Sequence, residues 1–548
     1  MAYLDSVQSE PGDCPSDPSE DAWFRQIAGE GPSLRQKQPS GCRTPPPQDE
    51  SVFDECRIFL SPRAKALLLE NGAKRWSIEL GGFLTNHLWH GILALAGLGA
   101  SDELISNFAA SYSKRLEPAR EDRHDLPQDV PRAVTGRLLP LGSREGFMRH
   151  VRAFELEVDT GPFLATGTHP SAAHVQGTTL ARLMDGLSGA AFHALIHLGT
   201  GLRLGIRPII MEGLGYVAHS FLPVGGENEI FDSAAVGFGS DAQCIAGGLE
   251  VVAQIRADGE LQRLLHSEWK SVQHLPTGFF QKCMHVFSAR GGASPAAALR
   301  LLHYARQISL PYAEPGVAAR ALLFLGLQMF VCASSSSWDY FLLHGVTAAF
   351  SLLAVIPHLD AAGGRRACQR LLCGLLATFV AQGCPELQPL SSSPTLTHDG
   401  GDVKNEEGIT DNYHRSKKRA RAEDSTSEGS SATVRERSIM NGGRRAEERE
   451  WLVLRQLALG QRGHAPGQAA EQPLRNEHAY KLVWFCEEID RDEDMVCSAA
   501  AGCGVGRGRV VPHSLLVAAS TKVLTMPMSG RTGEAPLSPR KQRGIEIM

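Results

Sequence analysis

Two short stretches of this chain place paired histidines inside apolar sequence that reads as helix. They are Asn86-His87-Leu88-Trp89-His90 and Phe192-His193-Ala194-Leu195-Ile196-His197. An α-helix turns by about 100° per residue, so residues three or four positions apart lie within about 60° of each other around the axis. Each stretch therefore presents two imidazoles on one face of a helix that is otherwise suited to a protein core. This pattern constrains the fold, because buried imidazole nitrogens need partners.

Four more histidines lie in similar apolar company: His219, His344, His358 and His478. A buried polar group without a partner costs about 1–3 kcal/mol, and a metal ion is the simplest shared partner for several neutral imidazoles. The alternative is that each one bonds to a separate backbone carbonyl, as a single buried histidine commonly does. Neither pair matches His-Glu-x-x-His, so the spacing does not indicate a zinc hydrolase. The histidines taken as candidate metal ligands are His87, His90, His193, His197, His344 and His478.

The composition of the 548 residues is uneven and divides the chain into five segments. Residues 1–51 are rich in Pro, Ser and acidic residues, and we expect them to be disordered. Residues 52–384 are dense in Leu, Ala, Val and Phe with helical periodicity, which predicts one large helical domain. Residues 385–475 are polar and of low complexity, as in an inserted segment dispensable for the core. Residues 476–496 contain a closing helix of the domain, and residues 497–548 form a tail without an assignment.

Helical patterns dominate the globular part, so the expected fold class is mainly all-α. The clearest strand candidate is residues 152–158, where a helix fits equally well. We expect the helix that begins at Thr178 to run to Leu198 and to end at Gly199-Thr-Gly201. We also expect Ser101 to be the N-cap of the helix over residues 103–114. The expected helices are 63–70, 84–98, 103–114, 178–198, 207–221, 242–257, 296–307, 315–332, 338–356, 364–381 and 478–488.

Charge and cysteine content indicate the surroundings of the protein. The net charge is −5 with no long basic face, so nucleic acid is not an expected partner. Twelve cysteines without a Cys-x-x-Cys pair indicate a reducing compartment, and the acidic N-terminus carries no signal sequence. The apolar runs 321–333 and 341–359 are interrupted by polar residues, which favours core helices over membrane spans. We therefore expect a cytoplasmic protein; nuclear import through Lys417-Lys418-Arg419-Ala420-Arg421 is the alternative.

Glycine-rich motifs do not predict a nucleotide fold. The segments 199–205 and 502–508 lack the Gly-x-Gly-x-x-Gly spacing between a strand and a helix that flavin and dinucleotide folds require. A Walker loop and a Gly-x-Ser-x-Gly elbow are also absent from the sequence. These absences argue against a flavin and leave NADPH possible, because a nicotinamide can be bound without that fold.

Several stretches, in their order along the chain, resemble the questin oxidase-like family. The resemblance covers roughly residues 52–384 and the helix at His478, which looks like the family's closing His-x-x-Lys helix. The segments 385–475 and 497–548 depart from the family pattern. The stretches that carry the resemblance are Asn86-His87-Leu88-Trp89-His90 with residues 94–100, residues 192–199, Pro208-Ile209-Ile210-Met211-Glu212-Gly213-Leu214, Leu343-His344-Gly345-Val346-Thr347 and residues 477–483.

The resemblance implies an oxidoreductase, typified by Baeyer–Villiger-type ring opening of an anthraquinone in secondary metabolism. It also implies a bulky aromatic substrate, and some relatives resemble non-haem iron oxygenases. Activation of dioxygen needs a cofactor, and iron suits a histidine-rich centre. We therefore expect a monooxygenase or dioxygenase with a non-haem metal; an NADPH-dependent, metal-free oxidoreductase and a non-enzymatic helical interaction protein are the alternatives. The sequence does not indicate an oligomeric state.

Three further residues are candidates for roles near the centre. Lys481 lies one helical turn after His478, and its amine can bind a metal only when deprotonated or when carboxylated by CO₂. An ordinary lysine that extends to the surface is the alternative. Glu212 and His219 are seven residues apart and nearly aligned on one helix, so we expect them to be catalytic, with Glu212 as a base or a partner of a ligand. Alternatively, Glu212 pairs with Arg207 on the surface.

Overall fold

A computed structural model of the chain gives the fold, and all the residues it describes belong to one compact unit, residues 49–525. The described residues are 60–72, 75–80, 83–119, 140–142, 146–160, 178–225, 241–288, 295–311, 313–333, 340–388, 451, 454, 458, 477–491 and 513–525.

The described part of the chain is mainly α-helical, as the sequence predicts. Its one sheet is a two-stranded antiparallel pair, β1 (Glu79–Leu80) and β2 (Leu84–Thr85), with Glu79 opposite Thr85. The longer helices are α2 (Pro62–Glu70), α3 (Leu88–Gly97), α4 (Asp102–Ser113), α5 (Phe147–Thr160), α6 (Thr178–Met184), α7 (His193–Leu204), α8 (Arg207–His219), α9 (Asp241–Asp258), α10 (Glu260–Val272), α11 (Phe279–Val286), α12 (Pro295–Ala305), α13 (Pro315–Cys332), α14 (Tyr340–Val355), α15 (Ala361–Ala381), α18 (Glu477–Arg491) and α19 (His513–Thr525).

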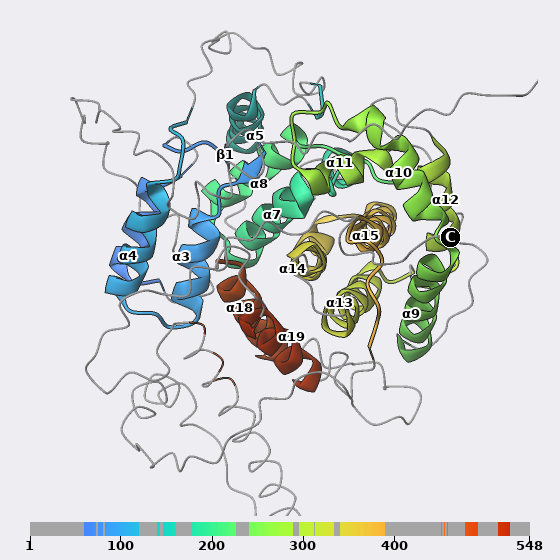
Figure 1. Cartoon of the computed structure of the whole chain (residues 1–548). Helices are drawn as coiled ribbons and strands as arrows, with labels where there is room; N and C mark the ends of the chain where they lie inside the picture. Colours follow the sequence, from blue (N-terminus) through green and yellow to red (C-terminus); the bar gives the residue numbers. More distant parts are fainter. Residues whose placement is uncertain are drawn as a thin grey trace, which may run out of the picture. The chain divides into compact units, whose positions relative to one another are not determined.

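The apolar helices α7, α13, α14 and α15 pack against one another at the centre (Figure 1). Helix α8 packs on α7 and helix α18 on α14, with α5 on the far side of α8 and α3 against α18. Helix α9 packs on α13 and α15, and helices α11 and α12 pack on α15. The side chains between the central helices are almost all buried aliphatic or aromatic groups. Burial of this apolar surface stabilises the helices far more than their intrinsic propensities do.

Helix ends follow the expected capping chemistry at several places. The hydroxyl of Ser101 accepts a hydrogen bond from the Leu104 N–H, which confirms Ser101 as the N-cap of α4. Ser61 and Asp360 cap α2 and α15 in the same way. Residues 152–158, the strand candidate, are helical and lie within α5.

The sequence-based prediction of one helix over Thr178–Leu198 is wrong. Helix α6 ends at Met184, and the chain turns through Asp185-Gly-Leu-Ser-Gly189 before α7 begins at His193. Asp, Ser and two glycines within five residues are poor helix formers, which explains the break. Gly199 does not end α7, which continues to Leu204 and is closed by Gly205 in the left-handed conformation. Instead, a Cβ at Gly199 would lie 2.5 Å from the Ser351 Cβ, so glycine there allows α7 and α14 to approach closely.

The chain after the polar segment returns to the core as α18 and α19. Helix α18 packs on α3, where Trp484 lies against Gly97: a Cβ at that glycine would come within 2.3 Å of the indole nitrogen. Helix α19, in the tail that the sequence left unassigned, packs on α18 and α13. Its buried Lys522 ammonium donates hydrogen bonds of 2.6 and 2.7 Å to the carbonyls of Phe330 and Ala333, which satisfies the C-terminal end of α13.

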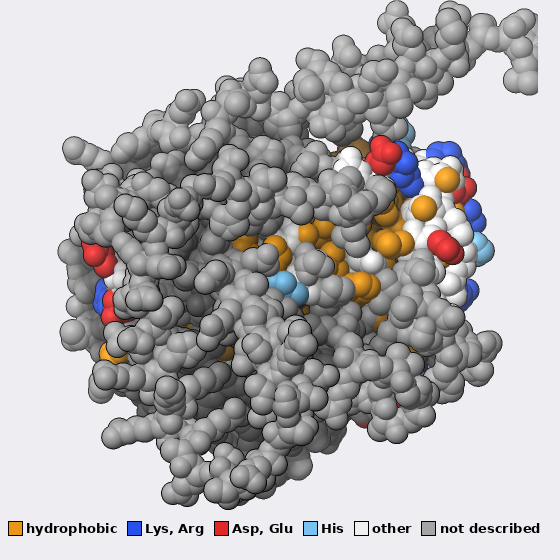
Figure 2. Space-filling model, turned by 90° about the horizontal axis from the view of Figure 1, so that it is seen from below, with side chains coloured by type: hydrophobic (Ala, Val, Ile, Leu, Met, Phe, Trp, Pro, Cys, Tyr) orange, Lys and Arg blue, Asp and Glu red, His pale blue; other side chains and the backbone are white. Residues whose placement is uncertain are grey.

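Two helical windows, Pro315–Cys332 and Phe341–His358, are apolar and long enough to cross a membrane by length and composition alone. In the structure, 72% and 67% of these windows are buried inside the protein, and core helices of soluble proteins meet the same criteria. On the face seen from below, hydrophobic side chains gather near the middle of the view, with a histidine among them (Figure 2). Among the described large hydrophobic residues, Leu299 is the exposed one, at 48%.

Three described residues of the segment 385–475 are buried: Trp451, Leu454 and Ala458. Their spacing of three and four residues is that of one apolar helical face, and the Trp451 ring lies 5.9 Å from the ring of His513 in α19. The end of the segment that we expected to be dispensable therefore contributes to the core.

Replacing Trp451 with alanine should lower the free energy of unfolding by about 3 kcal/mol, because it removes a large buried ring and leaves a cavity. Urea denaturation followed by circular dichroism would measure the change. Leu299→Ala, at an exposed position of α12, is the control and should change stability by less than about 0.5 kcal/mol. Equal stabilities for the two variants would show that Trp451 is not part of the folded core.

Candidate metal centre

Four imidazoles from four different segments meet inside the described helical core. They belong to His87 at the start of α3, His193 at the start of α7, His344 in α14 and His478 in α18. One nitrogen from each ring lies within 4.8 Å of the corresponding nitrogens of the others. Nitrogens that share a metal ion lie about 2.0–2.2 Å from it, so small rotations of the rings bring these atoms to bonding distance. We call this group the four-histidine cluster.

Local hydrogen bonds fix the backbone of His87 at the N-terminal end of α3. The Asn86 side-chain oxygen accepts a hydrogen bond from the Leu88 N–H at 3.0 Å, which starts the helix immediately after His87. The Tyr112 hydroxyl accepts from the His87 backbone N–H at 2.9 Å. Tyr112 belongs to α4, so the packing of α4 on α3 also orients the first histidine of the cluster.

The chain reaches His193 through a left-handed turn. Ala190, Ala191 and Phe192 have φ angles of 49°, 54° and 66°, a region that costs a residue with a Cβ roughly 1–2 kcal/mol. The turn is buried, and the Phe192 ring packs where Gly374 of α15 leaves room for it. Packing therefore maintains a strained backbone immediately before a cluster histidine, as often occurs at functional sites.

The same turn sets the tautomer of His193. Its Nδ1 lies 2.6 Å from the Ala190 carbonyl oxygen, which can only accept, so Nδ1 carries the hydrogen. The lone pair is then on Nε2, which accepts a hydrogen bond of 2.9 Å from the Nε2 of His344. A carbonyl that holds the far nitrogen of an imidazole is the usual support of a histidine that binds metal.

Burial favours the neutral form of three imidazoles of the cluster. The pKa values of His87, His193 and His478 lie well below 6.5, mainly because burial penalises the charged ring. The positive charge of Lys481 lowers all three further, and for His193 the neighbouring His344 has the larger effect. Neutral imidazole is the form that binds a metal ion.

Lys481 is buried with the cluster rather than extended to the surface. Its side chain is 2% exposed, and it lies on α18 one turn after His478. A buried ammonium among imidazoles repels a metal cation, whereas a deprotonated or carboxylated amine does not. The state of this amine therefore determines whether the cluster can bind a metal.

His90 and His197 form a second group beside the cluster. Their rings lie 5.1 Å apart, and the His90 ring is 5.9 Å from that of His87. Burial, followed by Lys481, lowers the pKa of His90 well below 6.5, and neither of its nitrogens has a hydrogen-bond partner among the described residues. The Nε2 of His197 lies 3.5 Å from the Glu212 carboxylate, which is buried.

His219 belongs to a different polar group at the other end of α8. Its Nε2 lies 3.7 Å from the Glu79 carboxylate of β1, and the Tyr216 hydroxyl donates to the same carboxylate at 3.3 Å. The fully buried ring of His150, on α5, is electrostatically coupled to His219. We expected His219 and Glu212 to act together, but His219 lies beside Glu79 and Glu212 lies beside His197.

The structure therefore divides the sequence-predicted site into parts. His87, His193, His344 and His478 converge, Lys481 lies beside them, and His90, His197 and Glu212 form an adjacent group. Glu79 and His150 could not be identified from the sequence, because their place beside His219 depends on tertiary contacts between β1, α5 and α8. The short strand around Glu79 gave no periodic signal that could have revealed them.

Comparison with known proteins identifies the family. The model of the questin oxidase-like family matches residues 84–424, which is more than half of the chain. This range includes His87, His193 and His344 and extends into the polar segment, whereas His478 and Lys481 lie outside it. No curated protein matches the chain.

Replacing Ala191 with glycine should leave the free energy of unfolding unchanged or raise it slightly. Glycine removes the left-handed strain of roughly 1–2 kcal/mol, which offsets its greater freedom in the unfolded chain of roughly 0.5–1 kcal/mol. Ala194→Gly, one turn of normal helix later, should cost about 1 kcal/mol because no strain is relieved. Thermal unfolding would measure both, and a larger loss for Ala191→Gly would contradict the strain.

Stability should rise between about pH 4 and pH 6.5, in part through His150. Burial, followed by the neighbouring His219, lowers the pKa of His150 to about 4 from the 6.5 that is usual for histidine. In this interval the unfolded chain binds more protons, so acid favours unfolding. His150→Leu should make the pH profile of the unfolding free energy shallower, and His266→Gln, at an exposed position of α10, should not. Parallel profiles for the parent and His150→Leu would exclude this effect.

Proposed function

This chain is a member of the questin oxidase-like family, and on that premise we propose that it is an oxidoreductase that opens a ring of an aromatic polyketide ketone with dioxygen. The family implies the oxidoreductase class. The proposal adds that the four-histidine cluster, His87, His193, His344 and His478, binds a non-haem metal ion. The convergence of their nitrogens within 4.8 Å is the observation that carries it.

The donor set suits a redox metal. Burial lowers the pKa values of His87, His193 and His478 and so favours their neutral forms. The tautomer of His193 places its lone pair on Nε2, which faces the other rings and would exchange its hydrogen bond with His344 for a bond to the metal. Iron, copper and zinc all accept such ligands, and iron fits an oxidation by dioxygen best. When bound, the metal would supply the activation of dioxygen, which the side chains of the chain cannot perform alone.

We propose that Lys481 is carboxylated when the metal is present. Reaction of its neutral amine with CO₂ forms a carbamate and releases a proton, so the buried positive charge is replaced by an anionic oxygen donor. Such a donor would complete a set of four imidazoles, whereas an ammonium at the same place would oppose metal binding. A protonated Lys481 instead supports the second candidate, an NADPH-dependent oxidoreductase that works without a metal.

His197 and Glu212 are suited to acid–base chemistry beside the cluster. The Nε2 of His197 faces the Glu212 carboxylate at 3.5 Å, and its Nδ1 has no hydrogen-bond partner among the described residues. Nδ1 can therefore accept the proton of a phenolic substrate while Glu212 stabilises the imidazolium through Nε2. Both side chains are buried, which excludes bulk water and strengthens this interaction.

The proposed substrate is a bulky aromatic small molecule, and the choice between one and two inserted oxygen atoms is open. The proposed location is cytoplasmic, where cysteines stay reduced. No disulfide joins the described cysteines Cys283, Cys332, Cys368, Cys373, Cys384 and Cys486. Neither a nucleic acid nor a membrane is part of the proposal.

The test separates ligands from acid–base residues. In protein prepared without a histidine tag, His344→Ala should lose both bound metal and turnover of an aromatic ketone, because one ligand of the cluster is removed. His197→Ala should keep the metal and lose turnover by about 10²-fold or more. Elemental analysis and oxygen consumption measure the two effects, and His303→Ala, at an exposed site on α12, is the control.

Two results would contradict the proposal. Parent protein free of metal but active with NADPH would support the metal-free oxidoreductase instead. Parent protein that oxidises no aromatic ketone under any cofactor condition would favour the non-enzymatic alternative.

A further inference from the structure

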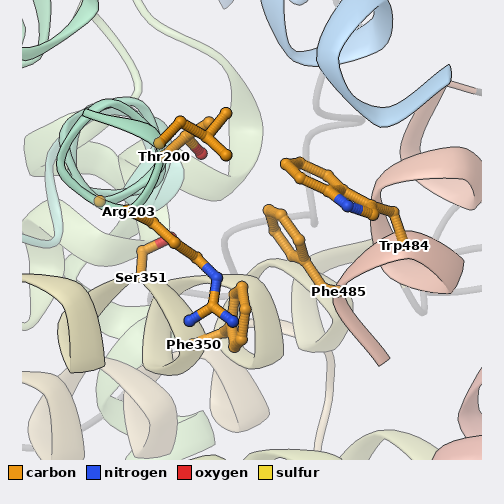
Figure 3. Close-up of a pocket in the computed structure, with 8 residues that line it drawn as sticks. Thr200, Arg203, Phe350, Ser351, Trp484 and Phe485 are labelled. Carbon is orange, nitrogen blue, oxygen red and sulfur yellow. The ribbon is translucent and has the colours of Figure 1, made fainter. Parts of the chain in front are cut away.

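Tight packing fixes the helices that carry three of the cluster histidines: His193 in α7, His344 in α14 and His478 in α18. A small pocket between these helices is lined by their own residues and has room for about one water molecule (Figure 3). The rings of Phe350 and Phe485, which line it, have centroids 4.7 Å apart. Side chains therefore fill the space between the three helices, and their histidines have little freedom to move.

His87 is held differently, because it precedes α3 as its N-cap. Its φ and ψ angles, −98° and 8°, are not those of a helix, and its side chain makes no capping hydrogen bond. The segment before it is the hairpin of β1 and β2, and Thr85 at the end of β2 precedes His87 by two residues. A two-stranded pair this short is marginally stable at best by itself. The position of His87 therefore depends on what holds the hairpin.

Tyr216 of α8 holds both strands of the hairpin. Its hydroxyl donates a hydrogen bond of 3.3 Å to the Glu79 carboxylate, and it lies 2.8 Å from the Thr85 hydroxyl. A tyrosine hydroxyl has a single hydrogen, so with this hydrogen on Glu79 the Thr85 hydroxyl donates to the Tyr216 oxygen. Glu79 and Thr85 are opposite each other in the strand pair. One hydroxyl thus joins β1 and β2 to α8.

Burial makes these hydrogen bonds restrictive. Tyr216, Glu79 and Thr85 are all buried, and the Nε2 of His219, on the same helix as Tyr216, lies 3.7 Å from the Glu79 carboxylate. Bulk water is excluded there, so it cannot replace a hydrogen bond that is lost when the hairpin shifts. The hairpin therefore has one favoured position on α8. The same helix carries Glu212 beside His197, four residues before Tyr216.

We propose that Tyr216 is a positioning residue that fixes the backbone of His87 in the four-histidine cluster through its hydrogen bonds to Thr85 and Glu79. The inference rests on the proposed function, because it takes that cluster to be the metal site. Helix α8 then sets the position of one metal ligand relative to the acid–base pair, since it holds the hairpin through Tyr216 and carries Glu212.

Titration of the metal-free, full-length protein with Co²⁺ alone, followed by visible absorption, tests the inference without turnover. Tyr216→Phe keeps the ring and removes the hydroxyl. It should weaken Co²⁺ binding about tenfold and change the absorption bands, which report the geometry of the ligands. Thr85→Val should have the same effect, whereas Thr85→Ser keeps a hydroxyl and should bind Co²⁺ as the parent does.

Tyr304→Phe is the matched control. Tyr304 is also buried and donates a hydrogen bond to a carboxylate, that of Asp258, but it lies on α12, which provides no residue of the cluster. Each tyrosine variant loses one such bond and should lower the melting temperature slightly. Only Tyr216→Phe should also weaken Co²⁺ binding, and equal Co²⁺ affinities of the two variants would overturn the inference.

Amide exchange in the metal-free protein distinguishes this inference from the proposed function. The His87 N–H, which donates to the Tyr112 hydroxyl, should exchange several-fold faster in Tyr216→Phe and Thr85→Val than in the parent or in Tyr304→Phe. Mass spectrometry of the peptide that contains residues 84–90 would measure it. Parent protein that binds no Co²⁺ would refute the metal site, and the exchange rates would then decide the inference alone. Unchanged exchange at His87 in both variants would overturn it.

Discussion

Burial of imidazoles in a helical core is the constraint on which the rest of this structure depends. Removing a histidine ring from water favours its neutral form, and this effect is the largest cause of the lowered pKa values of His87, His90, His193 and His478. A neutral ring has a lone pair and a single hydrogen, and both need partners. The helices must therefore bring the rings together or provide a carbonyl for each ring. In this structure four rings are brought together, those of His87, His193, His344 and His478.

Close helix packing makes this convergence possible. Helices α7 and α14 approach closely because Gly199 lies against Ser351, and α18 approaches α3 because Gly97 leaves room for Trp484. The left-handed turn before α7 directs the first residue of that helix into the cluster and supplies the Ala190 carbonyl for its Nδ1. The strain in this turn is small compared with the apolar burial around it, so the core can maintain it.

The buried polar groups form layers at increasing distance from the cluster. The four rings and Lys481 come first, followed by His90, His197 and Glu212, and then by Glu79, Tyr216 and His219 at the far end of α8. Helix α8 links the last two groups, because Glu212, Tyr216 and His219 are four and three residues apart and share one face.

The sequence by itself determined the mainly α fold, the family and the residue types of the site, because apolar periodicity and paired histidines are properties of local segments. It did not determine which histidines share a centre. That choice depends on contacts among helices that are hundreds of residues apart, as with His87 and His478. It also missed the left-handed turn before α7, which packing maintains against its strain, and the contact of Glu79 with His219, which joins a two-residue strand to α8. Only the tertiary structure decided these features, because each depends on distances between segments that no local pattern encodes.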